Sequence, residues 1–415
     1  MLFFYRLAIN FIFLISPIII IFRILKKKED PKRFYEKIGK FSKKNINNNL
    51  IWFHGSSVGE ILSIVPLIEK LEKRKNIKKI LITSNTLSSA KIIKKLKLKK
   101  TFHQFFPLDT KFLVEKFLNH WKPKAVFFIE SEIWPNMIIK IKEKNIPLIL
   151  LNARITKKSF KKWKIFIFFS KKIFSKFDLC LSQNNTTSNY LKNLGAKNIK
   201  KIGNLKFSQS VSELKSKSKI KMEKFLRKKR IIFSAISTHK GEELLCGKAY
   251  INLKKKYKGI ITIIIPRHIN RSHEIKDELN SLGLRIHLHT SNKPISFDTD
   301  IYLVDTFGET KFFLKLSKIA FMGKSIFAYG GQNPLEAARF GNRIIHGPNI
   351  ENFTEVYDFL KKQGISSKIR SYKDLESLVK KFDRKKNYSQ QIIKKLSYTG
   401  NQILLNNEKE INKYF

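Results

Sequence analysis

Acidic residues follow strand-like segments at several points of this 415-residue chain, where they are placed to move a proton. The stretch WFHGSSVGE, from Trp52 to Glu60, starts as an apolar strand and breaks into glycines and serines. It ends on an acid just where an apolar helix begins. Such a corner exposes backbone N–H groups, and small residues let a ligand approach them. Glu60 itself has two interpretations, a partner for the helix dipole or a catalytic acid/base.

A second acidic site follows the next apolar run but one. In FFIESEIWPN, Glu130 and Glu132 close a strand and Trp134 begins a turn. Two acids and a tryptophan at the end of a strand favour a functional site over solvated loop acids. The stretch GNLKF adds Lys206, although in a chain with this many lysines its position alone indicates little.

The second half carries residues suited to anions and sugar hydroxyls. IIIPRH ends a strand with Pro266, Arg267 and His268, which places a fork of donors at the strand's end that suits phosphate. VDTFGE ends another strand with Phe307, Gly308 and Glu309, where an acid can accept from a ribose hydroxyl pair.

The stretch YGGQNPLEAARFG is the most informative of the second half. Two glycines, Gly330 and Gly331, precede a helix start at which Pro334 suits the first helical position. A glycine turn that leads into a helix predicts an anion pocket, with Asn333 in the turn. Glu336, one turn into the helix, is placed to bind sugar hydroxyls.

Several other patterns in the sequence do not indicate a functional site. Asp298 and Asp300 form an Asp-x-Asp pair, but it lies in a polar connector, so we expect no metal there. His287 and His289 alternate along a probable strand without a third ligand, which makes zinc unfavourable. The chain contains no GxGxxG, Walker or GxSxG motif, which disfavours dehydrogenases, nucleotide triphosphatases and hydrolases.

Short apolar runs that alternate with amphipathic stretches position these residues. The runs of the first half are 51–55, 79–84, 125–131, 147–153 and 179–183, and those of the second half are 230–237, 259–267, 300–306, 319–325 and 343–349. Alternation of this kind predicts βαβ units and parallel sheets. A polar, lysine-rich patch at 208–224 separates two α/β halves, which we expect to join near residue 215. Ligands should bind at the carboxyl ends of the strands, in a cleft between the halves.

Composition and the first residues bear on location. Lys+Arg 84 against Asp+Glu 32 gives a net charge of +52, which attracts nucleic acid, anionic lipid or phosphorylated substrates. The lysines are spread throughout the chain, which favours a basic surface near a membrane over a nucleic-acid site. Sixteen uncharged residues, 7–22, precede Lys26–Lys28, so we expect an inner-membrane anchor with the rest of the chain in the cytoplasm. A buried first helix is the alternative. Phe34, Tyr35 and Lys37 are further candidates for membrane contact.

Taken together, the motifs resemble those of the Kdo transferases, which add 3-deoxy-D-manno-octulosonic acid (Kdo) to the lipid A precursor. The resemblance rests on WFHGSSVGE, FPLDT, ESEIWPN, LNARIT, GNLKF, STHKGEE, PRH, DTFGE and GGQNPLEAARFGNRIIHGPNIENF, in the expected order. It implies two Rossmann-like domains facing a cleft, the glycosyltransferase-B (GT-B) fold, with an N-terminal membrane-anchor helix. We expect the anchor at 1–25, an acceptor-binding domain at 26–215 and a CMP-Kdo-binding domain at 216–415, whose last helix packs back on the first.

The resemblance also implies roles for single residues. Glu60 matches the family's proton acceptor, and Glu130 and Lys206 match positions that stabilise the transition state. The CMP-binding segments of the family match Pro266, Arg267, Phe307, Gly308, Glu309, Asn333, Pro334, Leu335 and Glu336. Gln332, Phe307 and Lys324 depart from the family pattern, at positions where His, Met and Gly are common.

The expected reaction is the transfer of Kdo, with inversion, from CMP-Kdo to the lipid A precursor, without a metal or another cofactor. The expected partners are these two substrates and the inner-membrane lipid surface, and no nucleic acid. Two alternatives remain: a GT-B enzyme that uses another nucleotide sugar, and a basic, membrane-attached nucleic-acid-binding protein.

Overall fold

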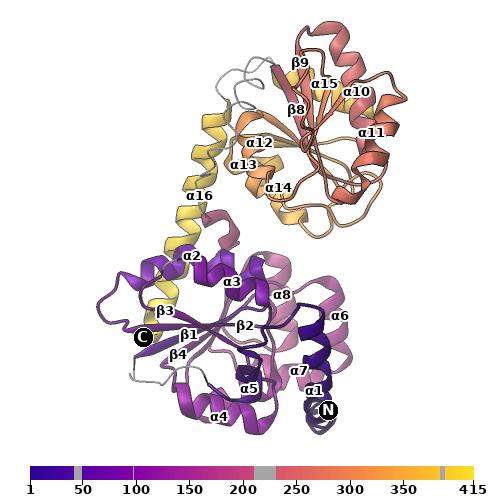
Figure 1. The fold of residues 1–415 in the computed structure, drawn as a ribbon. Helices are drawn as coiled ribbons and strands as arrows, with labels where there is room; N and C mark the ends of the chain where they lie inside the picture. The colour runs from indigo at the N-terminus through magenta and orange to yellow at the C-terminus, as the bar shows by residue number, and fades with distance from the viewer. Residues whose placement is uncertain (42–48, 97, 210–229, 384–387) are drawn as a thin grey trace. The chain divides into compact units, whose positions relative to one another are not determined.

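The computed structural model describes residues 1–41, 49–96, 98–209, 230–383 and 388–415. It divides into two compact units, each built on one parallel β-sheet with helices on both faces (Figure 1). The first unit comprises Met1–Ser210 and Thr399–Phe415, and the second comprises Val211–Tyr398. The junction predicted near residue 215 lies outside the described residues.

The sheet of the first domain has seven strands in the order β3-β2-β1-β4-β5-β6-β7, all paired in parallel. The strands in the middle of this sheet are mostly apolar and buried, as is expected where helices cover both faces, whereas the two edge strands carry polar, partly exposed residues. They are β1 (Leu50–His54), β2 (Lys79–Ser84), β3 (Thr101–Phe105), β4 (Ala125–Ile129), β5 (Leu148–Ala153), β6 (Leu179–Ser182) and β7 (Ile199–Lys201).

The helices of this domain mostly begin at serine, threonine or asparagine caps. Ser57, Thr86, Thr110, Thr156 and Asn184 each accept a backbone N–H of the first turn. The helical segments are α1 (Leu2–Leu25), η1 (Phe34–Ile38), α2 (Val58–Glu72), α3 (Leu87–Lys95), α4 (Lys111–Trp121), α5 (Pro135–Glu143), α6 (Lys157–Ile165), α7 (Ile167–Phe174), α8 (Asn185–Leu194) and η2 (Leu205–Ser208).

The second domain repeats this plan with the strand order β10-β11-β9-β8-β12-β13-β14. Its strands are β8 (Arg230–Thr238), β9 (Ile260–Pro266), β10 (Ile286–Leu288), β11 (Ile301–Leu303), β12 (Ile319–Met322), β13 (Arg343–His346) and β14 (Ser366–Lys368). Its helical segments are α10 (Glu242–Lys256), η4 (Ile269–Arg271), α11 (Ser272–Asn280), α12 (Thr310–Leu316), α13 (Leu335–Arg339), α14 (Thr354–Lys362) and α15 (Tyr372–Asp383).

The last long helix, α16 (Tyr388–Ile411), ends in η5 (Asn412–Tyr414). Its C-terminal part belongs to the first domain and is held there by ion pairs. Lys70 of α2 and Arg74, just beyond it, lie 3.0 and 2.8 Å from the Glu408 carboxylate, and Lys200 of β7 lies 2.9 Å from Glu410.

The α/β class and the parallel sheets are confirmed, while several strand ends differ from prediction. The run at 125–131 stops at Ile129, because Glu130 has a left-handed φ of 56° that ends the strand. The run at 300–306 shortens to Ile301–Leu303. The sequence did not predict β3 and β7, whose residues mix polar and apolar types, or β14, whose residues are all polar. Pro334 caps α13 in place of its predicted first helical position, which Leu335 takes.

Candidate active site

The carboxyl ends of β1 and β4 meet at the centre of the first sheet, because these two strands are neighbours. Helix α2, which follows β1, carries Glu60 in its first turn, and the loop after β4 carries Glu130 and Glu132. Residues about 70 positions apart in sequence therefore share one edge of the sheet, as parallel pairing dictates.

Glu60 forms a capping box at the start of α2. Its Oε2 accepts the backbone N–H groups of Ser56 at 2.7 Å and Ser57 at 3.3 Å, and its own N–H donates to Ser57 Oγ at 3.3 Å. Gly55 makes this corner possible, because a Cβ there would lie 3.2 Å from Glu60 Cβ. A Cβ on Gly59 would meet nothing within 4 Å, so that face of the corner is open.

The environment of Glu60 favours its protonated form. Burial, followed by the nearby charges of Glu132 and Glu130, raises the pKa of Glu60 to about 7. The two hydrogen bonds from Ser57 and Ser56 act in the opposite direction and do not cancel this effect. A carboxylate whose pKa lies near neutral pH is suited to take a proton and release it again.

Glu132 is held as a carboxylate by three side chains. Its Oε2 lies 3.1 Å from His54 Nε2 and accepts from Trp134 Nε1 at 2.8 Å. Burial raises the pKa of Glu132. Hydrogen bonds from His54, Trp134 and Ser56, together with the charge of His54, outweigh burial and keep this pKa below its usual value. Glu132 therefore provides a fixed negative charge beside Glu60.

Glu130 and Lys206 form the shortest charged contact of this edge, with Lys206 Nζ 2.6 Å from Glu130 Oε1. The carboxylate of Glu130 is 8% exposed, so the pair is largely desolvated. Asn152, at the end of β5, positions the lysine's turn by accepting the N–H of Leu205 at 3.0 Å. The three residues predicted to be catalytic thus lie around one group of carboxylates.

In the second domain, the predicted nucleotide-binding residues follow three strands of one sheet edge. Pro266 closes β9 and the exposed Arg267 follows it, while Phe307–Glu309 lie between β11 and α12. Asn333–Glu336 lead into α13, where Asn333 Oδ1 accepts the N–H of Leu335 at 3.1 Å and Glu336 lies 3.7 Å from Lys311. The side chain of Phe307 is 72% exposed, so it is available to a ligand.

Sequence reasoning assigned no role to Glu242, which organises this edge. Its carboxylate is fully buried and accepts four backbone N–H groups, those of His239, Lys324, Ser325 and Ile326, at 2.8 to 3.0 Å. It thereby ties the loop after β8 to the loop after β12. The motif STHKGEE carried the signal, since it places an acid beside Gly241 at a strand-to-helix corner.

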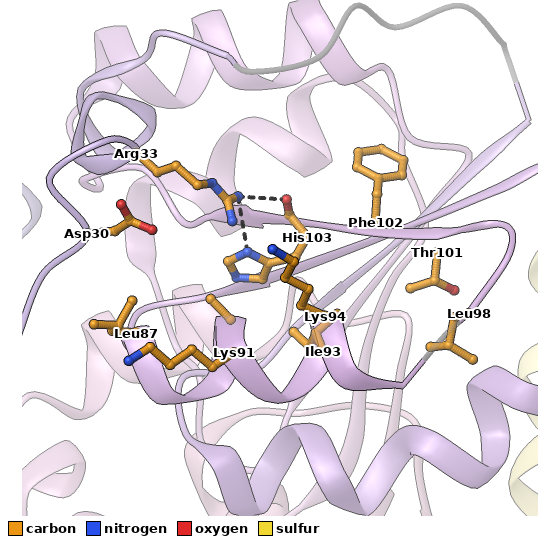
Figure 2. Close-up of a pocket in the computed structure, with 11 residues that line it drawn as sticks. Asp30, Arg33, Leu87, Lys91, Ile93, Lys94, Leu98, Thr101, Phe102 and His103 are labelled. Carbon is orange, nitrogen blue, oxygen red and sulfur yellow. Dashed lines mark hydrogen bonds between the residues drawn. The ribbon is translucent and has the colours of Figure 1, made fainter.

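A cavity of about 640 Å³ lies elsewhere in the first domain, between α3 and the edge strand β3 (Figure 2). Its lining combines apolar side chains such as Leu87 and Phe102 with the basic Lys91 and Lys94. The residues that line it include none of those predicted to carry chemistry, so the cavity and the carboxylate cluster are separate features.

Known proteins are similar in sequence to this chain over most of its length. The family model for 3-deoxy-D-manno-octulosonic-acid transferase matches residues 32–209. A protein of Rickettsia bellii named 3-deoxy-D-manno-octulosonic acid transferase is 35% identical over 370 residues, which are 88% of each chain. The chain belongs to the Kdo transferase family. A probable mitochondrial Kdo transferase of Arabidopsis thaliana is 32% identical over 85% of this chain and 82% of its own.

Solved structures support the fold of this Kdo transferase family member. A UDP-N-acetylglucosamine 2-epimerase superposes with a TM-score of 0.61 at 12% identity, over 89% of this chain and 96% of its own. The Neisseria meningitidis enzyme of that name gives 0.58 at 14%, over 88% and 98%. The predicted GT-B fold class, the predicted family and the predicted glycosyltransferase class are confirmed.

Proposed function

We propose that this protein transfers Kdo from CMP-Kdo to the lipid A precursor, with Glu60 as the general base and with inversion at the anomeric carbon. One observation carries the proposal. A half-buried carboxylate with a pKa of about 7 lies beside two further acids, one of them paired with a lysine, at the carboxyl edge of a parallel sheet. Family membership supports the choice of Kdo as the transferred sugar.

The proposed step has a simple balance of bonds and charges. A hydroxyl oxygen of the acceptor forms a bond to the anomeric carbon of Kdo while Glu60 takes the hydroxyl proton. The bond from that carbon to the phosphate oxygen breaks, and CMP leaves with the electron pair. General-base help of this kind typically contributes about 10²–10⁴-fold to the rate.

Glu130 and Lys206 are proposed to stabilise the charges that develop during this step. Glu130 supplies negative charge where the sugar becomes electron-poor. Lys206, 2.6 Å from it, supplies positive charge for the carboxylate that Kdo itself carries. A desolvated pair is effective here, because charges act more strongly away from water.

The second domain is proposed to hold the CMP moiety of the donor. Arg267, exposed at the end of β9, suits the phosphate, and Glu309 and Glu336 suit hydroxyl groups. Glu242 holds the loop at Lys324–Ile326 through three backbone N–H groups, which fixes the approach to the Gly330–Gly331 turn.

The acceptor is proposed to be the phosphorylated, acylated disaccharide of the cytoplasmic leaflet of the inner membrane. The apolar helix α1 and the net charge of +52 both favour such an anionic surface. The catalytic domains are then expected on the cytoplasmic side.

A transfer assay tests this proposal. Detergent-purified protein is incubated with freshly generated CMP-Kdo and the tetraacylated lipid A precursor, and the mass of the lipid product is measured by mass spectrometry. We expect lipid mass to rise by whole Kdo units. Parallel reactions contain UDP-N-acetylglucosamine as the donor, or a Kdo-free lipid without phosphates as the acceptor. Transfer from the UDP-sugar, or no transfer from CMP-Kdo by folded protein, would contradict the proposal.

A further inference from the structure

The 24-residue helix α1 belongs to the first domain and has buried residues at intervals along its length, Ile9, Ser16 and Ile20. Its partly or fully buried residues recur every three or four positions, which is the spacing of one helix face. They are Leu2, Tyr5, Arg6, Ile9, Phe13, Ile15, Ser16, Ile20, Arg23 and Ile24, and all but Ile15 follow this spacing closely. A helix that crosses a membrane beside its domain would contact that domain only near one end.

The N-terminal end of α1 is tied to loops that follow β3 and β4. Tyr5 Oη donates to Asp109 Oδ2 at 2.6 Å, and Arg6 Nε donates to Asn136 Oδ1 at 3.0 Å. Asp109 is fully buried and also accepts the N–H groups of Asn136 and Met137 at 3.0 and 2.8 Å. These contacts give a structural role to Asp109 of FPLDT and Asn136 of ESEIWPN, two residues that the proposed chemistry does not use.

The C-terminal end of α1 is tied to the same edge of the sheet. Arg23 Nε donates to Glu29 at 3.1 Å, and Lys37 Nζ donates to Glu29 at 2.7 Å and to the carbonyl of Asn85, after β2, at 3.2 Å. The side chain of Lys37 is only 14% exposed, so its predicted contact with a membrane is wrong.

The chain that leaves α1 is fixed further along. Arg33 pairs with Glu36 and donates to the carbonyl of His103 in β3 at 2.9 Å (Figure 2). Glu36 is fully buried and accepts the N–H of Phe105 at 2.8 Å. The tether at the C-terminal end is therefore part of the packed domain.

The two tethers exclude a transmembrane orientation for α1. A helix of 24 residues is about 36 Å long, and the hydrocarbon core of a bilayer is about 30 Å thick. A spanning α1 would place its two ends on opposite sides of the bilayer. Here the first end contacts Asp109 and Asn136 directly, and the last end is linked to the same domain through Glu29 and Lys37. We infer that α1 lies in the plane of the membrane interface, flat against the domain, and inserts its outer face into one leaflet.

The outer face of α1 has the chemistry of a lipid contact. It exposes large apolar side chains without a charged residue between Arg6 and Arg23, and the exposed Lys26–Lys28 follow it. Most of these side chains are more than half exposed: Phe3, Phe4, Leu7, Phe11, Leu14, Ile18, Ile21, Phe22 and Leu25. An apolar face of this size with flanking lysines fits a bilayer with anionic headgroups.

A second apolar corner supports the same partner. Helix α7 packs on α5, the helix to which Arg6 is tied. Ile165 at the end of α6 and Phe168 in the first turn of α7 are 72% and 87% exposed, within a lysine-rich stretch. Helix α5 therefore contacts both α1 and α7.

The inference rests on the membrane location proposed above and sharpens it. Arg23 of α1 is linked through Glu29 and Lys37 to Asn85, in the loop after β2. Asn85 in turn donates to Ser56 Oγ, in the corner of Glu60, at 2.7 Å. An in-plane α1 therefore holds the lipid surface beside the edge of the sheet that carries Glu60.

Depth measurements with spin labels test the orientation without any donor sugar. Single cysteines replace Phe4, Phe11, Ile18 and Leu25, which lie seven positions apart on the outer face, in full-length protein whose buried Cys180 and Cys246 are changed to alanine. The labelled proteins are bound to vesicles that contain anionic phospholipid, and access to oxygen and to a water-soluble nickel reagent is recorded. The exposed Ser281→Cys serves as a water-accessible control.

We expect similar, shallow depths at all four positions. A spanning helix would instead place Phe11 about 10 Å deeper than Phe4, since seven residues rise by about 1.5 Å each, and this result would overturn the inference. Labels that reach no lipid would also overturn it, whether they stay in water or show concentration-dependent spin broadening from a second copy covering the face. Because no transfer is measured, the proposed enzymatic activity can fail or succeed independently.

Discussion

Two strand-to-helix corners, one in each domain, place a glutamate at the start of a helix and use it differently. In the first domain, WFHGSSVGE ends on Glu60, which is partly exposed and accepts two N–H groups of its own corner. In the second domain, STHKGEE contains Glu242, which is fully buried and accepts four backbone N–H groups, three of them from another loop.

The two carboxylates differ in how many of their oxygens accept backbone hydrogen bonds. The four donors around Glu242 use both of its oxygens, so it acts as a joint between two loops. Both bonds to Glu60 use Oε2, and burial with the charges of Glu132 and Glu130 raises its pKa to about 7. The same residue at the same topological position is structural in one domain and suited to proton transfer in the other.

The largest effect on the transfer rate is expected from the substitution Glu60→Gln in the first corner. We expect transfer to fall by about 10²–10⁴-fold, because an amide cannot take the acceptor proton. Product formation by mass spectrometry under initial-rate conditions measures this loss. Full activity in the variant would return Glu60 to the role of a helix cap.

Stability provides the control for this variant, since glutamine at the third helical position keeps the capping box. The raised pKa of Glu60 means that the wild type loses stability as pH rises from the unfolded pKa, about 4.5, to the folded value, about 7. Glu60→Gln lacks this ionisation. Denaturant unfolding should therefore show the variant gaining on the wild type across that window.

The substitution Glu242→Gln should chiefly lower stability, whereas Glu60→Gln chiefly lowers the rate of transfer. We expect the free energy of unfolding to drop by about 3 kcal/mol, because an amide offers one acceptor oxygen to donors that filled two and faces the others with N–H groups. Thermal unfolding with and without CMP measures it. The exposed Glu69→Gln is the matched control and should change stability by less than about 0.5 kcal/mol. An unaltered stability in Glu242→Gln would remove the contrast between the corners.

The pair of Lys206 and Glu130 sharpens the comparison, because a desolvated ion pair can be structural or functional. Lys206→Met should lower kcat/KM at least about tenfold and also destabilise the domain, since it leaves a buried carboxylate without its cation. The double variant with Glu130→Gln should recover stability and not activity. Recovery of both would make the pair purely structural. Lys201→Met, on the exposed end of β7, is the control.

The smallest effect is expected at Gly59, where a Cβ meets nothing within 4 Å. Gly59→Ala should stabilise α2 by about 0.5 kcal/mol and raise the KM for the lipid acceptor, because the added methyl group occupies the open face of the corner. Substrate-dependence curves separate KM from kcat. An unchanged KM would mean that the acceptor does not approach Gly59.

The sequence predicted those features of the fold that depend on local pattern. Continuous apolar runs such as KILITS indicated buried parallel strands, and β2 has those bounds. The strand β3, TFHQF, was missed because its polar residues have partners that only the fold supplies. His103 lies 2.9 Å from Ser84 Oγ and 3.2 Å from the guanidinium of Arg33, 70 positions away.

The candidate site shows the same limit. The residue types of Glu60, Glu130 and Lys206 were visible in the sequence, and the family resemblance supplied their roles. The contacts of these residues could not be predicted from the sequence. The Glu130–Lys206 pair joins positions 76 apart and depends on a turn that follows the edge strand β7. Glu242 was overlooked because its importance lies in the backbone of another loop, which no spacing within STHKGEE reveals.

The pH dependence of kcat/KM for Kdo transfer, measured on the wild type and on Glu132→Gln, tests the central assignment most directly. If Glu60 is the base, kcat/KM rises with pH through a midpoint near 7, and removal of the Glu132 charge moves that midpoint lower. A profile that is flat between about pH 5.5 and 8.5, or a midpoint that does not move in Glu132→Gln, would contradict Glu60 as the group that accepts the proton.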